Sequence, residues 1–309
     1  MKTESASSIT ISNTQLNVQS TSDVETALQD VKQVIAETLA GASWSILKDI
    51  ASTHLSNHGR CIRAQIALRA ADLLELPASK GIHFAAACEL VHSASLVHDD
   101  IQDGDRMRRG QPTLWVQYGV QQAITAGDLM LMVPTLALEN APYTNEQKWE
   151  LSRCIARRAA ATACGQALDY SMANAGFATR YEYEQAARGK TGQLFAMPVE
   201  GIALLAGCRE NAQALGDAAT ILGILFQLKD DLIDFYGEKH RGLPGSDLRE
   251  GKMNALFVSH FENVPEDRIK LQEALCSTNA DVHPDVVNEW TKRLIDGGAF
   301  DHVIEWGNA

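Results

Sequence analysis

The chain is dominated by long stretches rich in Ala, Leu, Glu and Gln, whereas the alternation of apolar and polar residues that marks a strand is nearly absent. Stretches of this kind predict helices. They cover residues 23–56, 63–76, 82–98, 120–139, 145–175, 181–190, 193–208 and 212–236, and Pro or Gly punctuates the boundaries at Pro77, Pro142, Gly176, Pro244, Pro265 and Pro284. A run of about ten helices without a break in composition predicts a single all-α domain.

The first residues do not share this pattern. Residues 1–22 are rich in Ser, Thr and Asn and lack apolar periodicity, so we expect a mobile N-terminal tail before a helical domain at 23–309. The N-terminus has neither the apolar core of a secretory signal nor the Arg-rich pattern of a transit peptide. Since no apolar stretch reaches the length of a membrane span, we expect none.

Composition narrows the possible classes of function. With 309 residues, of which 45% are hydrophobic, the chain is long enough for a large core. Its net charge of -12 argues against nucleic acid as a partner, because binding to a phosphate backbone needs a basic face. The six cysteines are scattered without a C-x-x-C pair, which indicates neither a zinc site nor a disulfide framework and fits a reducing cytoplasm.

Candidate chemistry begins at residues 96–110, which read LVHDDIQDGDRMRRG. Asp99, Asp100 and Asp103 lie three and four positions apart, so they share one face at the end of a predicted helix. A helix C-terminus is already partially negative, and clustered carboxylates there need a cation. Mg²⁺ suits such oxygen ligands and fills its other positions with water and phosphate oxygens. Because Arg108 and Arg109 follow and are suited to phosphate, the stretch predicts a diphosphate site.

A second copy of the D-D-x-x-D spacing lies far down the chain. Residues 226–234 read FQLKDDLID, and Asp230, Asp231 and Asp234 again end an apolar helical run. A single acidic turn is equally well explained as a solvated surface in a chain of this charge. Two acidic turns facing each other across a cavity could instead hold several divalent ions around one diphosphate.

Two basic residues and a histidine add a possible second anion site. Arg60 and Arg63 lie three apart at a predicted helix start, where backbone N–H groups also favour an anion. The alternative for both is an ordinary solvated helix start. His92, about two turns before Asp99, is by default a core histidine, but an imidazole inside an apolar helix needs a partner that a second anion would supply.

These residues together resemble the trans-type (head-to-tail) isoprenyl diphosphate synthases, the family that includes farnesyl and geranylgeranyl diphosphate synthases. The resemblance rests on G-R-x-x-R at 59–63, H-x-x-S-L-V-H-D-D-I-Q-D at 92–103, M-R-R-G at 107–110, A-G-D at 126–128, G-Q-x-x-D at 165–169, G-K-T at 189–191, F-Q-x-x-D-D-x-x-D at 226–234 and G-S-D-x-R-E-G-K at 245–252. It implies a helical bundle around a deep central cavity. The implied reaction condenses isopentenyl diphosphate with an allylic diphosphate, and the implied assembly is a homodimer.

The resemblance also assigns roles to residues. Two to three Mg²⁺ ions would be held by Asp99, Asp100, Asp103, Asp230, Asp231 and Asp234. Arg108, Lys190 and Lys252 would add positive charge to the allylic diphosphate, and Thr191 and Gln227 would lie near the allylic cation. Isopentenyl diphosphate would be held by Arg60, Arg63, His92 and Arg109, while Gln166 and Asp169 would face the same cavity. The implied catalytic set is Asp99, Asp103, Arg108, Lys190, Thr191, Gln227 and Asp230.

Product length is expected to depend on the residues before the first acidic turn. In the family, bulky aromatic residues there stop the product at C10 or C15, whereas here the positions are small: Cys88, Val91, Ala94 and Ser95. This predicts a product of C20 or longer, with geranylgeranyl diphosphate the first choice and a longer polyprenyl diphosphate the second. Phe84 and residues 130–132 are candidate floors of the tunnel, although core filling is the ordinary role of a Met.

Three departures from the family pattern keep alternatives open. Arg60 stands where Lys is usual and Cys61 where a basic residue is common; the loop at 237–245 is short; and the chain ends at Ala309, where many relatives continue. One alternative is a terpene cyclase, and another is a non-catalytic partner subunit. The presence of Arg63, His92 and Arg109 argues against the cyclase, and two intact acidic turns argue against the subunit.

Overall fold

A computed structural model describes residues 21–40, 45–56, 59–236, 245–276 and 284–309. The N-terminal part contains α1 (Thr21–Ala40), α2 (Ser45–Ser56), α3 (Ile62–Leu73), α4 (Ala78–Gln102), the strands β1 (Met107–Arg108) and β2 (Gln111–Pro112), α5 (Leu114–Tyr118), α6 (Val120–Met132) and the 3₁₀ helix η1 (Val133–Leu138). The middle contains α7 (Asn145–Ala175), α8 (Arg180–Ala187), the π-helical turn η2 (Arg188–Gly192), α9 (Gln193–Leu205) and α10 (Arg209–Tyr236). The C-terminal part contains α11 (Ser246–Glu250), α12 (Ala255–Asn263), the 3₁₀ helix η3 (Pro265–Asp267), α13 (Arg268–Cys276), α14 (Pro284–Asp296) and α15 (Ala299–Asn308).

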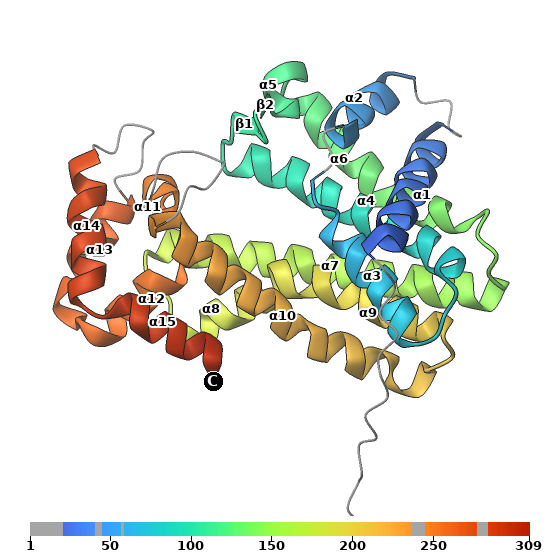
Figure 1. Cartoon of the computed structure of the whole chain (residues 1–309). Helices are drawn as coiled ribbons and strands as arrows, with labels where there is room; N and C mark the ends of the chain where they lie inside the picture. The colour runs from blue at the N-terminus through green and yellow to red at the C-terminus, as the bar shows by residue number, and fades with distance from the viewer. Residues whose placement is uncertain (1–20, 41–44, 57–58, 237–244, 277–283) are drawn as a thin grey trace, which may run out of the picture.

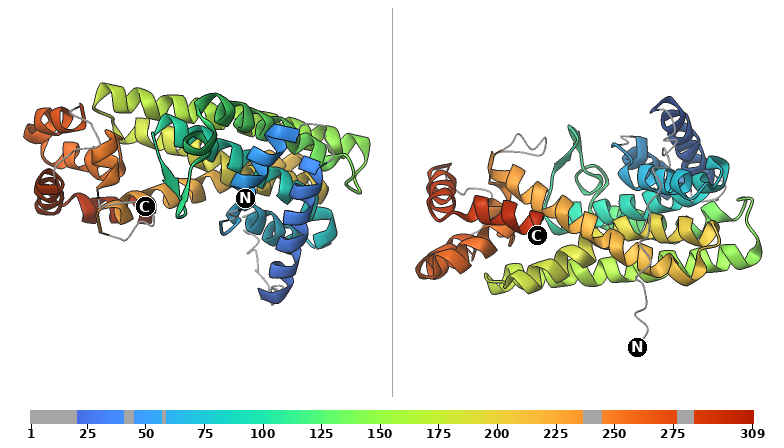
Figure 2. Two further views of the ribbon diagram at one scale, coloured as in Figure 1. Left: turned by 90° about the horizontal axis from the view of Figure 1, so that it is seen from above. Right: turned by 60° about the horizontal axis from the view of Figure 1, so that its bottom comes forward.

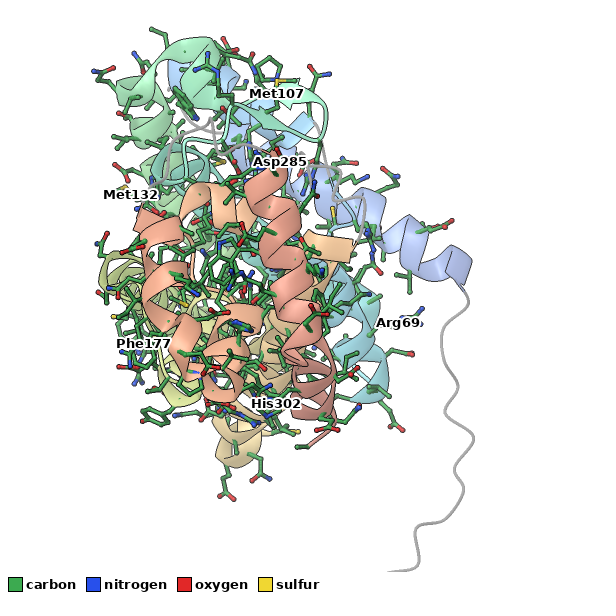
Figure 3. All side chains as sticks on the ribbon, turned by 90° about the vertical axis from the view of Figure 1, so that its left-hand side faces the viewer. Arg69, Met107, Met132, Phe177, Asp285 and His302 are labelled. Atoms are coloured by element: carbon green, nitrogen blue, oxygen red, sulfur yellow. The ribbon has the colours of Figure 1, made fainter. Side chains whose placement is uncertain are left out.

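The expected all-α fold is confirmed. Long helices α7 and α10 run across the molecule, with α1–α3 toward one end and α11–α14 at the other (Figures 1 and 2). Figure 3 looks onto this second end, where His302 and Asp285 come from the C-terminal helices and Phe177 from the α7–α8 connection. Within the described part of the chain, no helix combines the length and hydrophobicity that crossing a bilayer requires.

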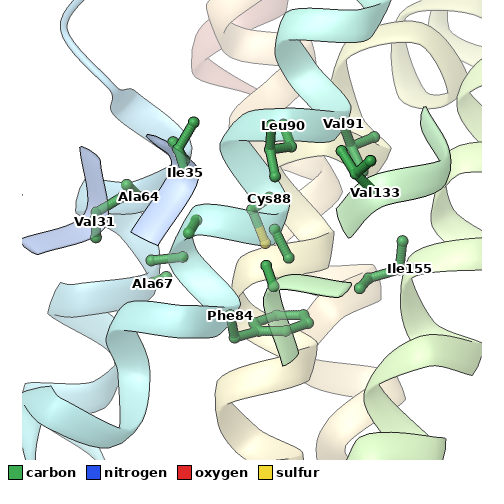
Figure 4. Close-up of a cluster of buried hydrophobic side chains, with 14 of the residues drawn as sticks. Val31, Ile35, Ala64, Ala67, Phe84, Cys88, Leu90, Val91, Val133 and Ile155 are labelled. Carbon is green, nitrogen blue, oxygen red and sulfur yellow. The ribbon is translucent and has the colours of Figure 1, made fainter. Parts of the chain in front are cut away.

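Helix α4 is the central element of the N-terminal part. Its apolar residues occur over most of the circumference, and the helix is accordingly covered by α1, α3, α6, η1 and α9. Phe84, Cys88 and Val91 point toward Val133 of η1 and Ile155 of α7 (Figure 4). This packing fixes the direction in which the end of α4 presents its aspartates.

Two local signals explain where predicted helices end or break. The helix expected at 120–139 changes to 3₁₀ geometry at Val133, because Pro134 has no N–H and cannot continue the α-helical ladder. The helix expected at 145–175 is confirmed: Thr144 and Gln147 form a reciprocal capping box at its start, and Gly176 ends it with a φ of 64°. The β1–β2 hairpin was not predicted from the sequence. The mobile tail expected at 1–22 falls almost wholly outside the described residues, as does most of the loop at 237–245.

Candidate active site

The first acidic turn is built at the C-terminal end of α4. Burial raises the pKa of Asp99, while Lys190 opposes this shift. Asp103 caps the helix and accepts a hydrogen bond of 2.9 Å from the Tyr170 hydroxyl; its carboxylate also lies 2.7 Å from Lys252 Nζ. Burial alone would raise the pKa of Asp103, but Lys252 and Lys190 outweigh it and hold the pKa below its ordinary value. An ionised carboxylate is therefore maintained beside two lysines.

Asp100 has a different environment from its two neighbours. It is buried and receives a hydrogen bond of 2.5 Å from Arg108 Nε, and Arg108 also lies 3.5 Å from Asp105. Burial raises the pKa of Asp100 to about 6 despite Arg108. Its second oxygen, Oδ2, has no hydrogen-bond partner among the described residues. Asp100 thus holds Arg108 in place, next to the acidic turn.

The second acidic turn lies at the end of α10, and two of its carboxylates are bound by protein groups. Asp231 accepts hydrogen bonds from the Tyr183 hydroxyl (2.7 Å), the Ala255 N–H (2.8 Å) and Gln227 Nε2 (2.9 Å). Its pKa is raised by burial and by Asp247.

Asp234 is buried as well, and it accepts hydrogen bonds from Ser246 Oγ (2.5 Å) and the Asp247 N–H (3.1 Å). Asp231 and Asp234 therefore attach the end of α10 to α11 and to the start of α12. Asp230 is only half-buried.

One turn of chain connects the two acidic turns. Lys190 of η2 lies 2.8 Å from Asp169 of α7, and its pKa is raised, against the effect of burial, by Asp169, Asp99 and Asp103. The next residue, Thr191, donates a hydrogen bond of 3.0 Å to Gln227, which lies three positions before Asp230 on α10. Consecutive residues of η2 therefore reach both walls of the site.

A separate cationic pocket lies where α3, α4 and the β1–β2 hairpin meet. It is lined by Gly59, Arg60, Cys61, Arg63, Glu89, His92 and Arg109, among others. Arg63 Nη1 lies 3.3 Å from His92 Nε2. Burial lowers the pKa of His92, and the positive charge of Arg63 lowers it further, so the imidazole is neutral at pH 7. The predicted group of Arg60, Arg63, His92 and Arg109 is thus brought together around one pocket.

Backbone geometry brings Arg109 to this pocket. Its φ of 51° is in the left-handed region, which is unusual for a residue other than glycine. A Cβ at Gly59 would lie 2.3 Å from Arg109 Nη2, so the missing side chain of Gly59 leaves space for the guanidinium. The hairpin after α4 thus delivers one arginine to the first acidic turn and the next to the cationic pocket.

Comparison with known proteins identifies the family of the chain. The family model described as polyprenyl synthetase matches residues 45–292. The chain belongs to this family. The expected prenyltransferase class is thereby confirmed.

Two relatives and one solved structure illustrate the similarity. The chain is 37% identical to a short chain isoprenyl diphosphate synthase of Methanocaldococcus jannaschii over 63% of this chain and 60% of that protein. It is 32% identical to a geranylgeranyl pyrophosphate synthase of Geoglobus acetivorans over 89% of this chain and 85% of the relative. The structure of geranylgeranyl pyrophosphate synthetase from Pyrococcus horikoshii Ot3 superposes with a TM-score of 0.83 at 28% identity, covering 93% of this chain and 88% of that one.

The family implies bound magnesium, and the metal-binding groups that this polyprenyl synthetase offers are the carboxylate oxygens that Mg²⁺ prefers. Asp99, Asp103 and Asp230 offer carboxylate oxygens, and Asp99 is a desolvated acid whose charged form a cation would stabilise. Among the described residues, no three His, Cys, Asp or Glu side chains form a complete metal site by themselves. In proteins, Mg²⁺ commonly takes one or two carboxylates and completes its coordination with water and substrate phosphate.

The residues expected to set product length lie on the buried side of α4. Cys88, Val91 and Ala94 are buried, and Ser95 is half-buried with its hydroxyl donating to the His92 carbonyl at 2.8 Å. The Phe84 ring lies against Gly201 of α9, where a Cβ would come within 1.9 Å of it.

The prediction that residues 130–132 form the floor of the product tunnel is wrong for Met132, which is 72% exposed to solvent. Met130 is fully buried and fills the core, whereas Leu131 is exposed too. Because successive residues of a helix point in different directions, three consecutive positions cannot all face one tunnel.

Three site residues were not predicted from the sequence. Glu89 lines the cationic pocket and accepts the Ala64 N–H at 2.9 Å, while Tyr170 and Tyr183 each donate a hydroxyl hydrogen bond to one acidic turn. Glu89 lies three positions before His92, so helical spacing alone could have placed both on one face. Nothing in the sequence near Tyr183 indicates its long-range contact.

Proposed function

We propose that this chain condenses isopentenyl diphosphate head-to-tail with an allylic diphosphate and releases geranylgeranyl diphosphate. This is supported most directly by two separate groups of residues that are each suited to a diphosphate. One group consists of the two acidic turns, which Lys190 and Thr191 of η2 connect, and the other is the pocket lined by arginines and a neutral histidine. A cyclase, which ionises a single diphosphate, has no use for the second site.

In the proposed mechanism, the allylic diphosphate binds at the acidic turns. Asp99, Asp103 and Asp230 would hold two to three Mg²⁺ ions, with Asp100, Asp231 and Asp234 in support. When bound, these ions neutralise the charge that develops on the diphosphate as its C–O bond breaks. Lys190 and Lys252, which now pair with Asp169 and Asp103, would turn their charge onto the leaving diphosphate together with Arg108.

The second substrate would bind in the cationic pocket. Arg60, Arg63 and Arg109 would hold the diphosphate of isopentenyl diphosphate. Arg63 donates to His92 Nε2, which places the imidazole proton on Nδ1, and Nδ1 has no partner among the described residues. This N–H is therefore available to a second diphosphate.

Bond formation would then need no dedicated base. The double bond of isopentenyl diphosphate attacks the allylic cation, a C–C bond forms, and the departing diphosphate takes the proton that is lost. The oxygens of Thr191 and Gln227 would lie near the cation and stabilise it by their dipoles, since they are already joined at 3.0 Å.

A C20 product is supported by the small side chains on α4 and by the printed names of the relatives. Ala94, Val91 and Cys88 are small buried side chains, and the product chain would extend along them toward Phe84 as the floor. Several similar proteins are named geranylgeranyl diphosphate synthases. The small side chains equally favour a longer polyprenyl diphosphate as the second candidate product.

We also propose a homodimer that packs through α6 and η1. Apolar side chains are exposed on these two helices at Val120, Ile124, Leu131, Met132 and Leu136, and the first three recur at the spacing of helical turns. Figure 3 shows Met132 at the periphery of the molecule. An apolar stripe of this kind is typical of an interface, and a second copy of the same stripe would cover it.

The cytoplasmic location expected from the cysteine pattern remains a prediction.

Product analysis tests the proposed function. The purified protein is incubated with Mg²⁺, labelled isopentenyl diphosphate and dimethylallyl, geranyl or farnesyl diphosphate, and the products are sized by chromatography. A labelled C20 diphosphate is expected. An unlabelled cyclic hydrocarbon would indicate a cyclase, and the absence of any product would favour a non-catalytic subunit.

A further inference from the structure

Lys190 and Thr191 lie in η2, a π-helical turn, which is a rare conformation in proteins. Residues 188–192 widen the helix between α8 and α9, and such widened turns frequently coincide with functional sites. η2 packs against α7 on one side and α10 on the other. What holds this irregular turn in place bears directly on the position of Lys190 and Thr191.

Glycine pairs bring the backbone of η2 against both neighbouring helices. On the α7 side, a Cβ at Gly165 would lie 2.1 Å from the Lys190 backbone nitrogen and 2.5 Å from Gly189 Cα. On the α10 side, a Cβ at Gly223 would lie 2.4 Å from Gly192 Cα. Real side chains do not tolerate such distances, so only glycine permits either approach.

Each helix provides a side-chain partner one turn beyond its glycine. On α7, Gly165 is followed four residues later by Asp169, which binds Lys190 at 2.8 Å. On α10, Gly223 is followed four residues later by Gln227, which binds Thr191 at 3.0 Å. Residues four apart on a helix lie on one face, so in each case the backbone contact and the side-chain contact act on the same turn of η2.

The two ends of η2 are also attached. Arg188 Nη1 donates to Thr220 Oγ1 of α10 at 2.6 Å. Just after the turn, Gln193 accepts a hydrogen bond of 2.7 Å from Arg158, a buried residue of α7. These bonds limit sliding of η2 along either helix.

We propose that Gly165 and Gly223 are positioning residues: by contact with Gly189 and Gly192 they set the depth at which Lys190 and Thr191 enter the site. This inference rests on the proposed function, in which Lys190 contacts the leaving diphosphate and Thr191 the allylic cation. An added methyl group at either glycine pushes η2 away from its helix. Misplacement of a catalytic group by about 1 Å costs about 100-fold in rate.

Steady-state kinetics of Gly165→Ala and Gly223→Ala test the inference. We expect kcat to fall about 100-fold in each while the KM for isopentenyl diphosphate stays unchanged, because the cationic pocket is built by other elements. The matched control is Gly81→Ala in α4, also a buried helical glycine, whose Cβ would meet its nearest neighbour at an ordinary 3.4 Å. The control should keep its activity.

A double-mutant cycle separates positioning from general damage. If Gly165 acts through Lys190, the Gly165→Ala and Lys190→Ala double variant is as slow as Lys190→Ala alone. The inference would be contradicted if the double variant were slower than Lys190→Ala by the factor that Gly165→Ala loses alone. Full activity of Gly165→Ala would contradict it as well. Should Gly165→Ala fail to fold by circular dichroism, the cycle is run with Gly223→Ala, on the other side of the turn, and Thr191→Val.

The result also distinguishes this inference from the proposed function. An unmodified enzyme that makes no prenyl diphosphate overturns both. The positioning role is overturned if the unmodified enzyme is active and its glycine variants keep full activity, or lose activity independently of Lys190 and Thr191. The proposed function is then unaffected.

Discussion

At the scale of single residues, the six aspartates of the two acidic turns have unequal surroundings. Asp100, Asp231 and Asp234 are buried and bound by Arg108, by Tyr183 or by Ser246, whereas Asp230 is half-buried and Asp103 pairs with a lysine that a substrate could take over. The D-D-x-x-D spacing predicts that three acids share a helix end. It cannot tell which of them hold the helix end to its neighbours, because those partners come from distant segments.

Replacement of Asp99 by Ala tests the metal role most simply. We expect kcat to fall about 100- to 1000-fold, because the residue acts on the charge of the leaving group. Thermal unfolding should show no loss of stability, since the raised pKa of Asp99 shows that the fold opposes its ionisation. Asp296→Ala, at an exposed position of α14, is the control and should behave as the unmodified enzyme. Near-normal turnover of Asp99→Ala would refute the metal role.

At the scale of elements, helix existence could be predicted from periodicity, but departures from α geometry could not. The α7 boundaries follow from Thr144 and Gly176, which are local signals. The η2 turn contacts Gly165, which lies 24 residues before Gly189, and Gly223, which lies 31 residues after Gly192; no local pattern indicates either contact. The G-K-T motif indicated that this segment belongs to the active site, but it did not predict the π-helical geometry.

The buried face of α4 gives a prediction on product length. Ala94→Phe should shorten the main product from C20 to C15, and Phe84→Ala should lengthen it beyond C20, since in the proposed function the first change adds bulk beside the product chain and the second removes the floor. Chromatography of the dephosphorylated products provides the measurement. Leu73→Phe, at the exposed end of α3, is the control and should leave the product unchanged. An unaltered distribution in both α4 variants would remove these positions as the length determinants.

The C-terminal helices give a prediction on acid stability. Burial would raise the pKa of Asp267, but hydrogen bonds from Arg293, His260 and Lys270 outweigh it and hold the pKa below its ordinary value of 3.8. A carboxylate whose pKa is lower in the folded than in the unfolded protein stabilises the fold at pH values above the unfolded-state pKa. This stabilisation is lost as the pH falls through the folded-state pKa. Asp267→Asn should therefore lose about 1 kcal/mol of unfolding free energy at pH 7, a size that allows for screening by solvent.

The same difference should shrink below pH 4. Urea unfolding at pH 7, 5 and 3 measures it, with Asp296→Asn as the exposed control. A difference that is constant across all three pH values would show that Asp267 stabilises the helices without its charge.

At the scale of the whole molecule, the all-α architecture followed from composition and periodicity, while the assembly of the two anion sites did not. The cationic pocket joins Gly59 and Arg109, which are 50 positions apart, through a hairpin that the sequence did not predict. Charge and helical position suggested Arg60, Arg63 and His92 as a possible anion site, and the resemblance to a family assigned Arg109 to the same site. Their physical proximity arises because the chain reverses direction after α4.

The exposed stripe on α6 predicts the oligomeric state. Ile124→Glu combined with Met132→Glu should convert a dimer to a monomer in sedimentation velocity, because charges would have to be buried in the apolar contact. Ile269→Glu on α13 changes an exposed apolar residue outside the stripe and should leave the dimer intact. A dimer that survives the double change would place the interface elsewhere.

The central claim is that both acidic turns bind one diphosphate through divalent cations. Titration calorimetry with an allylic thiolodiphosphate, which cannot ionise readily, measures this without turnover. We predict tight binding with Mg²⁺, loss of binding with a chelator, and weakened binding in Asp99→Ala and in Asp230→Ala alike. Binding that is independent of Mg²⁺, or that survives the loss of either aspartate unchanged, would contradict the claim.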